Sequence, residues 1–285
     1  MSTPTIGVLA GVGALPIVAA REIKNQGFRC VVVALFPENS KELQQYADAY
    51  YFINPSEMGR IIATFQQENC TEIALLGKVS KQILYSDFRP DAHWMSIFNR
   101  LTSKNDDAVL MAIVDELAAH GITVFEQARF LGQTVLKLGV HTKREPTAEE
   151  LANLRFGYHL AKGLAGLDIG QTIAIAKGAV LAVEAIDGTN ATILRGGKLA
   201  QGPVTVLKVS KPQQDLRFDI PVVGLDTVES MKAAGGGVLA LEADQVFFLD
   251  LPEAIEFADQ NNITICAFNP RAVSAGEVEL FQEGR

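Results

Sequence analysis

Hydrophobic runs alternate with amphipathic stretches through the first half of the chain. Strands are predicted where the apolar run is continuous, at 5–10, 30–36, 50–53 and 72–77, with helices between them at 15–26 and 56–69. Continuous apolar runs of this length are typical of parallel strands that are covered by helices on both faces. The first half of the chain therefore predicts an α/β domain with a Rossmann-like open sheet.

The pattern changes after the fourth strand. Two amphipathic helices are predicted at 93–104 and 105–120, and a polar stretch with a proline, 141–147, is the best candidate for a linker. Beyond it, helices at 147–165, 226–234 and 252–260 accompany strands at 172–176, 179–185, 204–209, 237–241, 246–249 and 262–267. We expect two domains, an N-terminal Rossmann-like domain over 1–140 and a C-terminal mixed α/β domain over 147–285.

The composition narrows the class of protein. A chain of 285 residues with 48% hydrophobic residues is long enough for two globular domains, each with its own core. The formal net charge of −8 argues against a nonspecific nucleic-acid binder, which needs a basic surface. The three cysteines are widely spaced in or beside apolar runs, which indicates buried thiols in a reducing compartment. Without a signal-peptide pattern or a run of ~20 apolar residues, the sequence predicts a cytoplasmic protein.

The first predicted strand ends in a glycine-containing turn that leads into a helix. Backbone amides at Gly11 and Gly13, together with the helix N-terminus, could bind a nucleotide or another phosphate ligand. A dinucleotide-binding turn would have a third glycine where Pro16 stands and an acid after the second strand, so NAD binding is disfavoured. Lys78 follows the fourth strand and would point into the crevice where such sheets bind ligands. The alternatives are a purely structural turn and a solvated lysine.

The densest polar segment, 208–221, lies between a predicted strand and a helix. In it Asp215, Arg217 and Asp219 alternate, so an extended backbone would place all three side chains on one face. Two carboxylates beside an arginine suit a site that holds a hard divalent cation together with a phosphate. The alternative is an ion-paired surface strand in which the arginine keeps both acids ionised.

Glu184 stands inside an apolar strand, where an unpaired carboxylate would be costly. It therefore needs a metal ion, an extra proton or a cationic partner, for which Lys177 and Arg195 are the candidates. Asp187 lies in a segment of ordinary turn composition close by. The four histidines show neither HxH nor HExxH spacing, so the sequence does not predict a histidine-rich zinc or two-metal site.

Several segments in a fixed order resemble one known family. The chain reads GVLAGVGALP near its start, GKVS and NDDAVL further on, then AVEAIDGT and KVSKPQQDLRFDIPVVGLDT. This series resembles the LpxI family of UDP-2,3-diacylglucosamine pyrophosphatases over nearly the whole chain, and its last motif is the specific part. The resemblance implies two domains that enclose the substrate and a Mg²⁺- or Mn²⁺-dependent attack of water on the α-phosphorus. The products would be UMP and 2,3-diacylglucosamine 1-phosphate, an intermediate of lipid A biosynthesis.

The resemblance and the patterns above together name the candidate site residues. Asp219 and then Asp215 are the candidates for the acid that is essential to the reaction. The candidates for contacts with the substrate or its phosphates are Gly11, Gly13, Lys78, Lys177, Lys211, Gln214, Arg217 and Thr227. The candidates for metal ligands are Asp219, Asp215, Glu184 and Asp187.

Partners and alternative functions follow from the same features. The acyl chains of such a substrate would give a reason for peripheral contact with the inner face of a membrane, and the sequence leaves a homodimer open. Two other functions stay open from the residues alone: a nucleotide- or lipid-binding protein without turnover, and a dinucleotide-dependent oxidoreductase. Hydrolysis would release UMP, hydride transfer would change the absorbance of a nicotinamide, and a binding protein would do neither.

Overall fold

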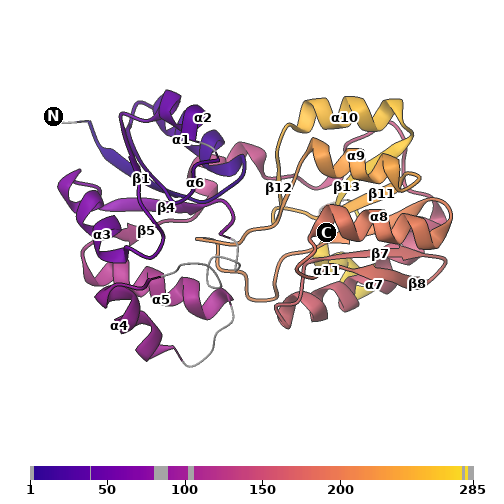
Figure 1. Ribbon diagram of the computed structural model, residues 1–285. Helices are drawn as coiled ribbons and strands as arrows, with labels where there is room; N and C mark the ends of the chain where they lie inside the picture. The colour runs from indigo at the N-terminus through magenta and orange to yellow at the C-terminus, as the bar shows by residue number, and fades with distance from the viewer. Residues whose placement is uncertain (1–2, 39, 80–88, 102–105, 278–279, 282–285) are drawn as a thin grey trace. The chain divides into compact units, whose positions relative to one another are not determined.

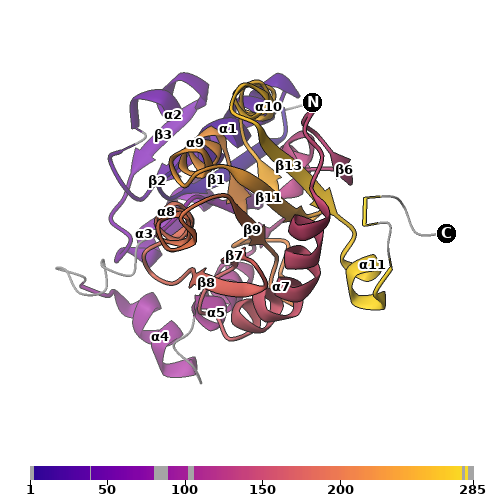
Figure 2. The same ribbon diagram turned by 90° about the vertical axis from the view of Figure 1, so that its right-hand side faces the viewer.

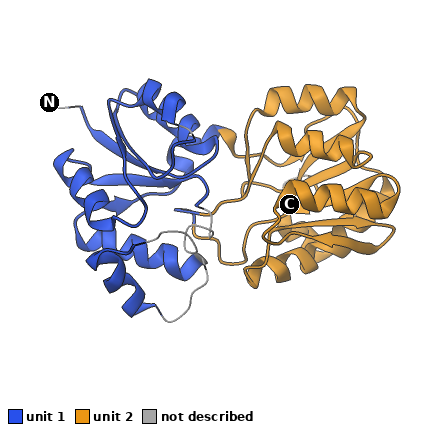
Figure 3. Ribbon diagram, viewed as in Figure 1, with its two compact units in different colours: residues 1–133, 216–218 blue, residues 134–215, 219–285 orange. Residues whose placement is uncertain are grey.

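The computed structural model (Figure 1) describes residues 3–38, 40–79, 89–101, 106–277 and 280–281. The chain forms two compact units, which Figure 3 shows in two colours. Unit 1 comprises Met1–Gln133 and Leu216–Phe218, and unit 2 comprises Thr134–Asp215 and Asp219–Arg285. Among the described residues, no helix has both the length and the apolar character needed to cross a membrane.

Unit 1 contains a five-stranded parallel sheet with the strand order β3-β2-β1-β4-β5. Its strands are β1 (Thr5–Ala10), β2 (Arg29–Ala34), β3 (Ala49–Phe52), β4 (Glu72–Leu76) and β5 (Thr123–Val124). The strand order reverses between β1 and β4, so the carboxyl ends of these two strands flank the switch point of the sheet. The predicted Rossmann-like open sheet is confirmed.

Helices cover both faces of this sheet (Figure 1). They are α1 (Leu15–Asn25), α2 (Ser40–Tyr46), α3 (Met58–Gln67), α4 (Ala92–Arg100), α5 (Asp106–Ala119) and α6 (Ala128–Leu131), followed by the 3₁₀ helix η2 (Gly132–Thr134). One face packs on α1 and α2, and the other forms a core with α3, α4 and α5 that includes Phe65 and Ile73. Gly7 permits close packing in this core, because a Cβ there would lie 2.8 Å from the ring of Phe65.

Unit 2 is built on a six-stranded mixed sheet with the order β6-β13-β11-β9-β7-β8. Its strands are β6 (Gly139–Val140), β7 (Thr172–Ala176), β8 (Ala179–Val183), β9 (Val204–Lys208), β11 (Gly237–Glu242) and β13 (Ile263–Phe268). A separate parallel pair is formed by β10 (Val222–Val223) and β12 (Phe247–Phe248). The central strands β9, β11 and β13 are parallel, whereas β6, β7 and β8 pair antiparallel. The predicted mixed α/β domain is confirmed.

The sheet of unit 2 also has helices on both faces (Figure 2). One face carries α8 (Thr189–Ala200), α9 (Leu225–Ala233) and α10 (Leu251–Gln260), and the other carries α7 (Ala148–Gly166) and α11 (Pro270–Ala275). Val206 and Leu239 belong to the core under α8–α10, whereas their neighbours Leu207 and Val238 belong to the core under α7. Successive residues of one strand thus face opposite cores, as the strand geometry requires.

The boundary between the units differs from the predicted one. Residues 134–146, which were expected to end the first domain and form a linker, belong to unit 2. β6 pairs with β13, and Arg144 forms an ion pair with Glu150 and donates a hydrogen bond to the Thr264 hydroxyl. Glu150 also caps α7 through reciprocal hydrogen bonds with Thr147. The polar residues of this region therefore form an ion pair and a helix cap within unit 2, and they do not form a linker.

The sequence pattern does not predict α8, because two glycines lie inside it. Glycine disfavours a helix interior by about 1 kcal/mol relative to alanine. A Cβ at Gly196 would lie 2.5 Å from the Cβ of Ala174, and one at Gly197 would lie 2.3 Å from Ala234 O. The two glycines therefore allow α8 to lie close against β7 and against the end of α9.

Three residues of the polar segment 208–221, which we call the acidic motif, belong to unit 1. Phe218 is 3% exposed and packs in the core formed by α3, α4 and α5. Leu216 O accepts a hydrogen bond of 2.9 Å from Gln127 N in the same unit. The chain therefore leaves unit 2 after Asp215 and returns to it at Asp219.

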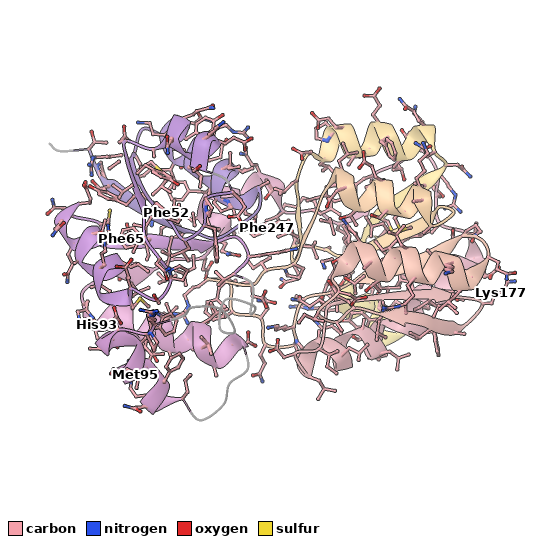
Figure 4. The ribbon with its side chains drawn as sticks, viewed as in Figure 1. Phe52, Phe65, His93, Met95, Lys177 and Phe247 are labelled. Atoms are coloured by element: carbon pink, nitrogen blue, oxygen red, sulfur yellow. The ribbon has the colours of Figure 1, made fainter. Side chains whose placement is uncertain are left out.

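We expect Phe218→Ala to lower the free energy of unfolding of unit 1 by about 3–5 kcal/mol, because it leaves a cavity in the core. Urea unfolding followed by the fluorescence of Trp94 measures this change, since the single tryptophan lies in the same core. The matched control is Phe52→Ala. Phe52, labelled in Figure 4, is 54% exposed, so its loss should change the free energy by at most about 0.5 kcal/mol. Equal effects would contradict the anchoring of the motif in unit 1.

Candidate functional site

The strand directions bring polar residues together at one end of the unit 2 sheet, where the parallel strands terminate. This end is called the edge of unit 2 below. β9, β11 and β13 are parallel and end at this edge, β7 is antiparallel to β9 and begins there, and β8 ends there. The polar residues at this edge are Gln171 and Thr172 at the start of β7, Glu184 after β8, Lys208 and Ser210 at the end of β9, and Glu242 at the end of β11. Open α/β sheets bind their ligands at the carboxyl ends of parallel strands, so this edge is the candidate site.

Lys208 and Glu184 form an ion pair at this edge. The Lys208 ammonium lies 3.5 Å from Glu184 Oε2 and donates to the hydroxyls of Thr172 and Thr189 at 3.1 and 2.8 Å. Thr189 Oγ1 donates to Glu184 Oε1 at 2.7 Å, and Gln171 N donates to Glu184 Oε2 at 3.2 Å. The pair therefore ties the end of β8 and the end of β9 to the first turn of α8.

The cationic partner predicted for Glu184 is wrong. The candidates were Lys177 and Arg195, but the observed partner is Lys208. Arg195 instead pairs with Asp187 at 2.7 Å. Lys177, labelled in Figure 4, lies in the hairpin between β7 and β8, at the end of the sheet opposite Glu184. The structure therefore does not bring Lys177 to the candidate site.

Glu184 carries its charge in spite of its burial. Burial raises the pKa of a carboxyl group, but Lys208 and the donors Thr172, Thr189 and Gln171 outweigh it, so the pKa of Glu184 lies below its ordinary value. Both oxygens are engaged by donors within the protein. This favours a structural ion pair over the predicted role of Glu184 as a metal ligand.

A second buried acid, which the sequence interpretation did not single out, holds the start of the acidic motif. Glu242 is 3% exposed, and its Oε2 lies 3.1 Å from Lys162 Nζ. The same oxygen accepts hydrogen bonds from Ser210 N and Ser210 Oγ at 2.8 and 2.9 Å. The available signal was an acid inside an apolar run, the signal that pointed to Glu184. Glu242 therefore fixes the backbone where the motif leaves β9.

Lys211 joins two carboxylates at the same edge. Its side chain is 7% exposed, and its Nζ lies 2.8 Å from Asp168 Oδ1 and 2.8 Å from Asp219 Oδ2. Both aspartates have a left-handed backbone, with φ of 56° and 54°, which aspartate adopts more readily than most residues. Asp219 and Lys211 were predicted site residues, whereas Asp168 follows α7 in a turn that gave no functional signal. These three residues form the charged cluster of the site.

The rest of the motif turns instead of extending. A turn lies at 216–217, and Arg217 belongs to unit 1 whereas Asp215 and Asp219 belong to unit 2. The extended backbone that would place the three side chains on one face is therefore not present, and that expectation is wrong. The alternation in the sequence reflects a loop that crosses between units.

Two other predicted site residues support the backbone of this region. Gln214 Oε1 accepts a hydrogen bond from Lys211 N at 3.2 Å, and Gln214 Nε2 donates to Asp219 O at 3.3 Å. Thr227 is 3% exposed, and its hydroxyl accepts from Gly224 N at 3.4 Å as part of the N-terminal cap of α9. Both side chains therefore shape the loop and the helix that follows it.

In unit 1 the glycine turn is closed by its own backbone. Gly11 N donates to Leu76 O at 2.7 Å, and Val12 and Lys78 exchange two backbone hydrogen bonds. A Cβ at Gly11 would lie 2.5 Å from Lys78 O, so glycine allows the turns after β1 and β4 to touch. The Gly11 amide is thus already bonded, contrary to its predicted use for a phosphate. The Lys78 side chain is exposed, and Gly13 has a φ of 111°.

The edge of unit 2 has the atoms that a cation and an anion would need. The carboxylate oxygens of Asp168 and Asp219 are the type of ligand that Mg²⁺ prefers. Gln171 Oε1 is buried and has no hydrogen-bond partner among the described residues, and a buried acceptor of this kind usually receives a donor, an ion or water. The helix α8 starts at this edge without a side-chain cap, and its dipole favours an anion.

Comparison with known proteins finds one family over most of the chain. The family model described as the LpxI N-terminal domain matches residues 5–134, and the LpxI C-terminal domain matches residues 137–266. The division between them lies next to the boundary between the two units. A protein from Caulobacter vibrioides named UDP-2,3-diacylglucosamine pyrophosphatase LpxI is 30% identical over 277 residues, which cover 93% of this chain and 98% of that protein.

The solved structures found by comparison have low similarity to this chain. A UDP-glucose 4-epimerase from Thermotoga maritima is 9% identical with a TM-score of 0.30, over 51% of this chain and 42% of that chain. A biotin carboxylase from Campylobacter jejuni is 17% identical with a TM-score of 0.28, over 70% of this chain and 42% of that chain. The chain thus spans less than half the length of these structures, and a likeness of this degree carries no argument about function.

We expect Glu184→Gln to lower the free energy of unfolding by about 3 kcal/mol at neutral pH, because it removes the carboxylate that pairs with the buried Lys208 ammonium. A folded-state pKa below the unfolded one stabilises the fold above the unfolded-state pKa, and this contribution is lost as the pH falls through the folded-state pKa. The difference from the wild type should therefore shrink below about pH 4. Urea unfolding at a series of pH values measures it.

The matched control for this measurement is Asp244→Asn in the same unit. It removes the ion pair between Lys137 and Asp244, whose side chains are 72% and 56% exposed. An exposed pair contributes less than about 1 kcal/mol, so the control should stay near the wild type throughout. A difference between Glu184→Gln and the wild type that does not change with pH would sink the charge-based explanation.

Proposed function

The chain belongs to the LpxI family, and we propose that it hydrolyses UDP-2,3-diacylglucosamine to UMP and 2,3-diacylglucosamine 1-phosphate, a step of lipid A biosynthesis. The relative from Caulobacter vibrioides is named for this activity and is matched over 98% of its length. Both the N-terminal and the C-terminal domain of the family are matched in this chain, which supports the proposal.

The cluster of Lys211, Asp168 and Asp219 carries the proposed location of the reaction. A pyrophosphate brings dense negative charge, so its site needs cationic groups, and the acid that acts on water must be accessible. The Asp219 side chain is 42% exposed, compared with 18% for Asp168, 13% for Glu184 and 4% for Glu242. Asp219 is therefore the acid of these ion pairs that substrate and water reach most easily.

The proposed reaction is attack of water on the α-phosphorus. Asp219 accepts a hydrogen bond from the attacking water and takes up its proton, and Lys211 holds the Asp219 carboxylate in place. As water adds, the bond from the α-phosphorus to the bridging oxygen breaks, and the sugar phosphate leaves with that oxygen. The Lys211 ammonium and the N-terminus of α8 favour the charge that develops on the phosphate oxygens.

A divalent cation, Mg²⁺ or Mn²⁺, is part of the proposal. Asp219 and Asp168 would hold it, and Asp215 is a further candidate. Both carboxylate oxygens of Glu184 and both of Asp187 already accept hydrogen bonds within the protein, so they are poorer candidates than the sequence suggested. When bound, the ion would withdraw electron density from the phosphate oxygens and lower the barrier to attack.

The alternative functions have less support. A dinucleotide-dependent oxidoreductase would use the glycine turn of unit 1, where the Gly11 amide already donates to Leu76 O. A protein that binds the same lipid nucleotide without turnover would keep the fold and the charged edge. Turnover therefore has to be measured directly.

We expect the purified protein to release UMP from UDP-2,3-diacylglucosamine in the presence of Mg²⁺ and to stop when EDTA is added. In ¹⁸O-labelled water, attack on the α-phosphorus places the label in UMP, because the water oxygen stays on the phosphorus that it attacks. Label in the sugar phosphate would instead indicate attack on the β-phosphorus. Tight binding of the substrate without UMP release would refute the enzymatic proposal and identify a binding protein.

We expect Asp219→Asn to lower kcat roughly 10²–10⁴-fold, because the amide cannot take up the proton of the attacking water. Asparagine tolerates the left-handed backbone at this position, where φ is 54°, so the substitution tests the charge and not the fold. Asp244→Asn is the matched control, since Asp244 is exposed and has a similar φ of 60°. A wild-type kcat in Asp219→Asn would remove this residue from the reaction.

A further inference from the structure

Two helices of unit 1 bring together a histidine, a glutamate and a second histidine that the proposed reaction does not use. His93, labelled in Figure 4, lies in the first turn of α4. Glu116 lies in the last turn of α5, and His120 is the first residue after that helix. We propose that His93, Glu116 and His120 form a binding site for a divalent transition-metal ion such as Zn²⁺. One ligand atom of each residue lies within 4.8 Å of those of the other two.

The two imidazole rings converge on Glu116. His93 Nδ1 lies 2.8 Å from Glu116 Oε1, and His120 Nδ1 lies 4.0 Å from the same oxygen and 2.8 Å from the main-chain Glu116 O. The centroids of the two rings are 5.1 Å apart, and the ring planes meet at 69°. The three groups therefore surround one position beside Glu116 Oε1.

These distances are close to those of a tetrahedral metal site. Metal–ligand bonds of ~2.0–2.1 Å place two ligand atoms ~3.3 Å apart and the centroids of two bound imidazoles ~5.2 Å apart. The observed ring separation of 5.1 Å already agrees with this arrangement. An ion that replaces the proton shared by His93 and Glu116 would widen their contact by about 0.5 Å, and His120 would move in by about 0.7 Å. His120 is 32% exposed and lies beyond the end of α5, so it has room for this shift, in which His120 Nδ1 gives up its proton and its hydrogen bond to Glu116 O in exchange for the bond to the ion.

The other two ligands are held in place before any ion binds. Gly59 of α3 packs against the ring of His93, since a Cβ there would lie 2.8 Å from His93 Cδ2. Glu116 is 7% exposed, and its second oxygen, Oε2, is paired with Arg100. Because Arg100 takes Oε2, Oε1 is the oxygen that faces the histidines. The Arg100 side chain is 49% exposed, so solvent and salt screen its charge from an ion.

The chemistry of the ligands selects the class of ion. Two imidazole nitrogens and one carboxylate oxygen favour Zn²⁺, Co²⁺ or Ni²⁺, whereas Mg²⁺ prefers an all-oxygen environment. The C-terminus of α5 adds a dipole that favours a cation at this position. The site is therefore chemically distinct from the oxygen-rich cluster of unit 2. A bound ion, with water as its fourth ligand, would join α4 to α5.

Titration of the metal-free full-length protein with Co²⁺ tests the proposal. We expect one Co²⁺ to bind with the visible ligand-field bands of a tetrahedral nitrogen and oxygen site, and Zn²⁺ to displace it. Substitution of one ligand, His120→Gln or His93→Gln, should weaken Co²⁺ binding at least ~10-fold. In addition, Zn²⁺ should raise the Tm of the wild type by more than it raises that of either variant. Neither readout depends on UMP release.

The matched control is the double variant His141→Gln/His159→Gln, which removes the other two of the four histidines. It should bind Co²⁺ as the wild type does, and loss of binding there would place the ion elsewhere. His120 is partly exposed at a helix end, so His120→Gln should keep the metal-free Tm of the wild type and isolate the effect on binding. The proposal is overturned if the wild type does not bind Co²⁺, or if both single variants bind it as tightly as the wild type.

Discussion

Three lysine ammonium groups lie at one edge of the unit 2 sheet with little access to solvent. The side chains of Lys208 and Lys211 are 7% exposed, and that of Lys162 is 19% exposed. An ammonium group that leaves water loses hydration free energy, which only a close anion and hydrogen-bond acceptors offset. Each lysine accordingly contacts a carboxylate, and the acids involved are Glu184, Asp168, Asp219 and Glu242. These ion pairs join the loops that meet at this edge. Glu242 binds the backbone of Ser210, while Lys211 reaches Asp219 on the returning side of the loop. The stability of the edge and its proposed chemistry thus depend on the same charges.

Much of the architecture could be predicted because its signals are local. Continuous apolar runs mark β1, β2, β4, β9, β11 and β13, and amphipathic spacing marks α1, α3 and α7. The predictions fail where the structure of a segment depends on contacts with residues elsewhere in the chain. α8 contains glycines whose purpose is close contact with Ala174 and Ala234, and β5, β6 and β10 are two residues long and exist only as partners of other strands. The misplaced domain boundary has the same origin, because the partners of Arg144 are Glu150 and Thr264.

Several residues of the site could be predicted from the sequence, but the partners with which they form ion pairs could not. An acid in an apolar run points to Glu184, and the motif points to Lys211 and Asp219, because these signals are contained in a few neighbouring residues. Their partners depend on the strand order, which places β7 beside β9 and thereby brings Glu184 to Lys208. The histidine cluster shows the same limit. The spacing of Glu116 and His120 places them on one side of a helix, but His93 comes from another helix, and only the packing of α4 on α5 unites them.

The charge balance at the unit 2 edge bears on how an acidic protein would hold a pyrophosphate. The ion pairs described there join three lysines with four carboxylates, so this group of side chains has a net charge of about −1 when all of them are ionised. The lysines alone would therefore not attract a polyanion. A divalent cation held by Asp219 and Asp168 would make the balance positive, and a phosphate bound beside it would in turn lower the cost of placing that cation near Lys211. In the proposed reaction, cation and substrate should therefore bind more tightly together than either binds alone, because each supplies the charge that the other lacks.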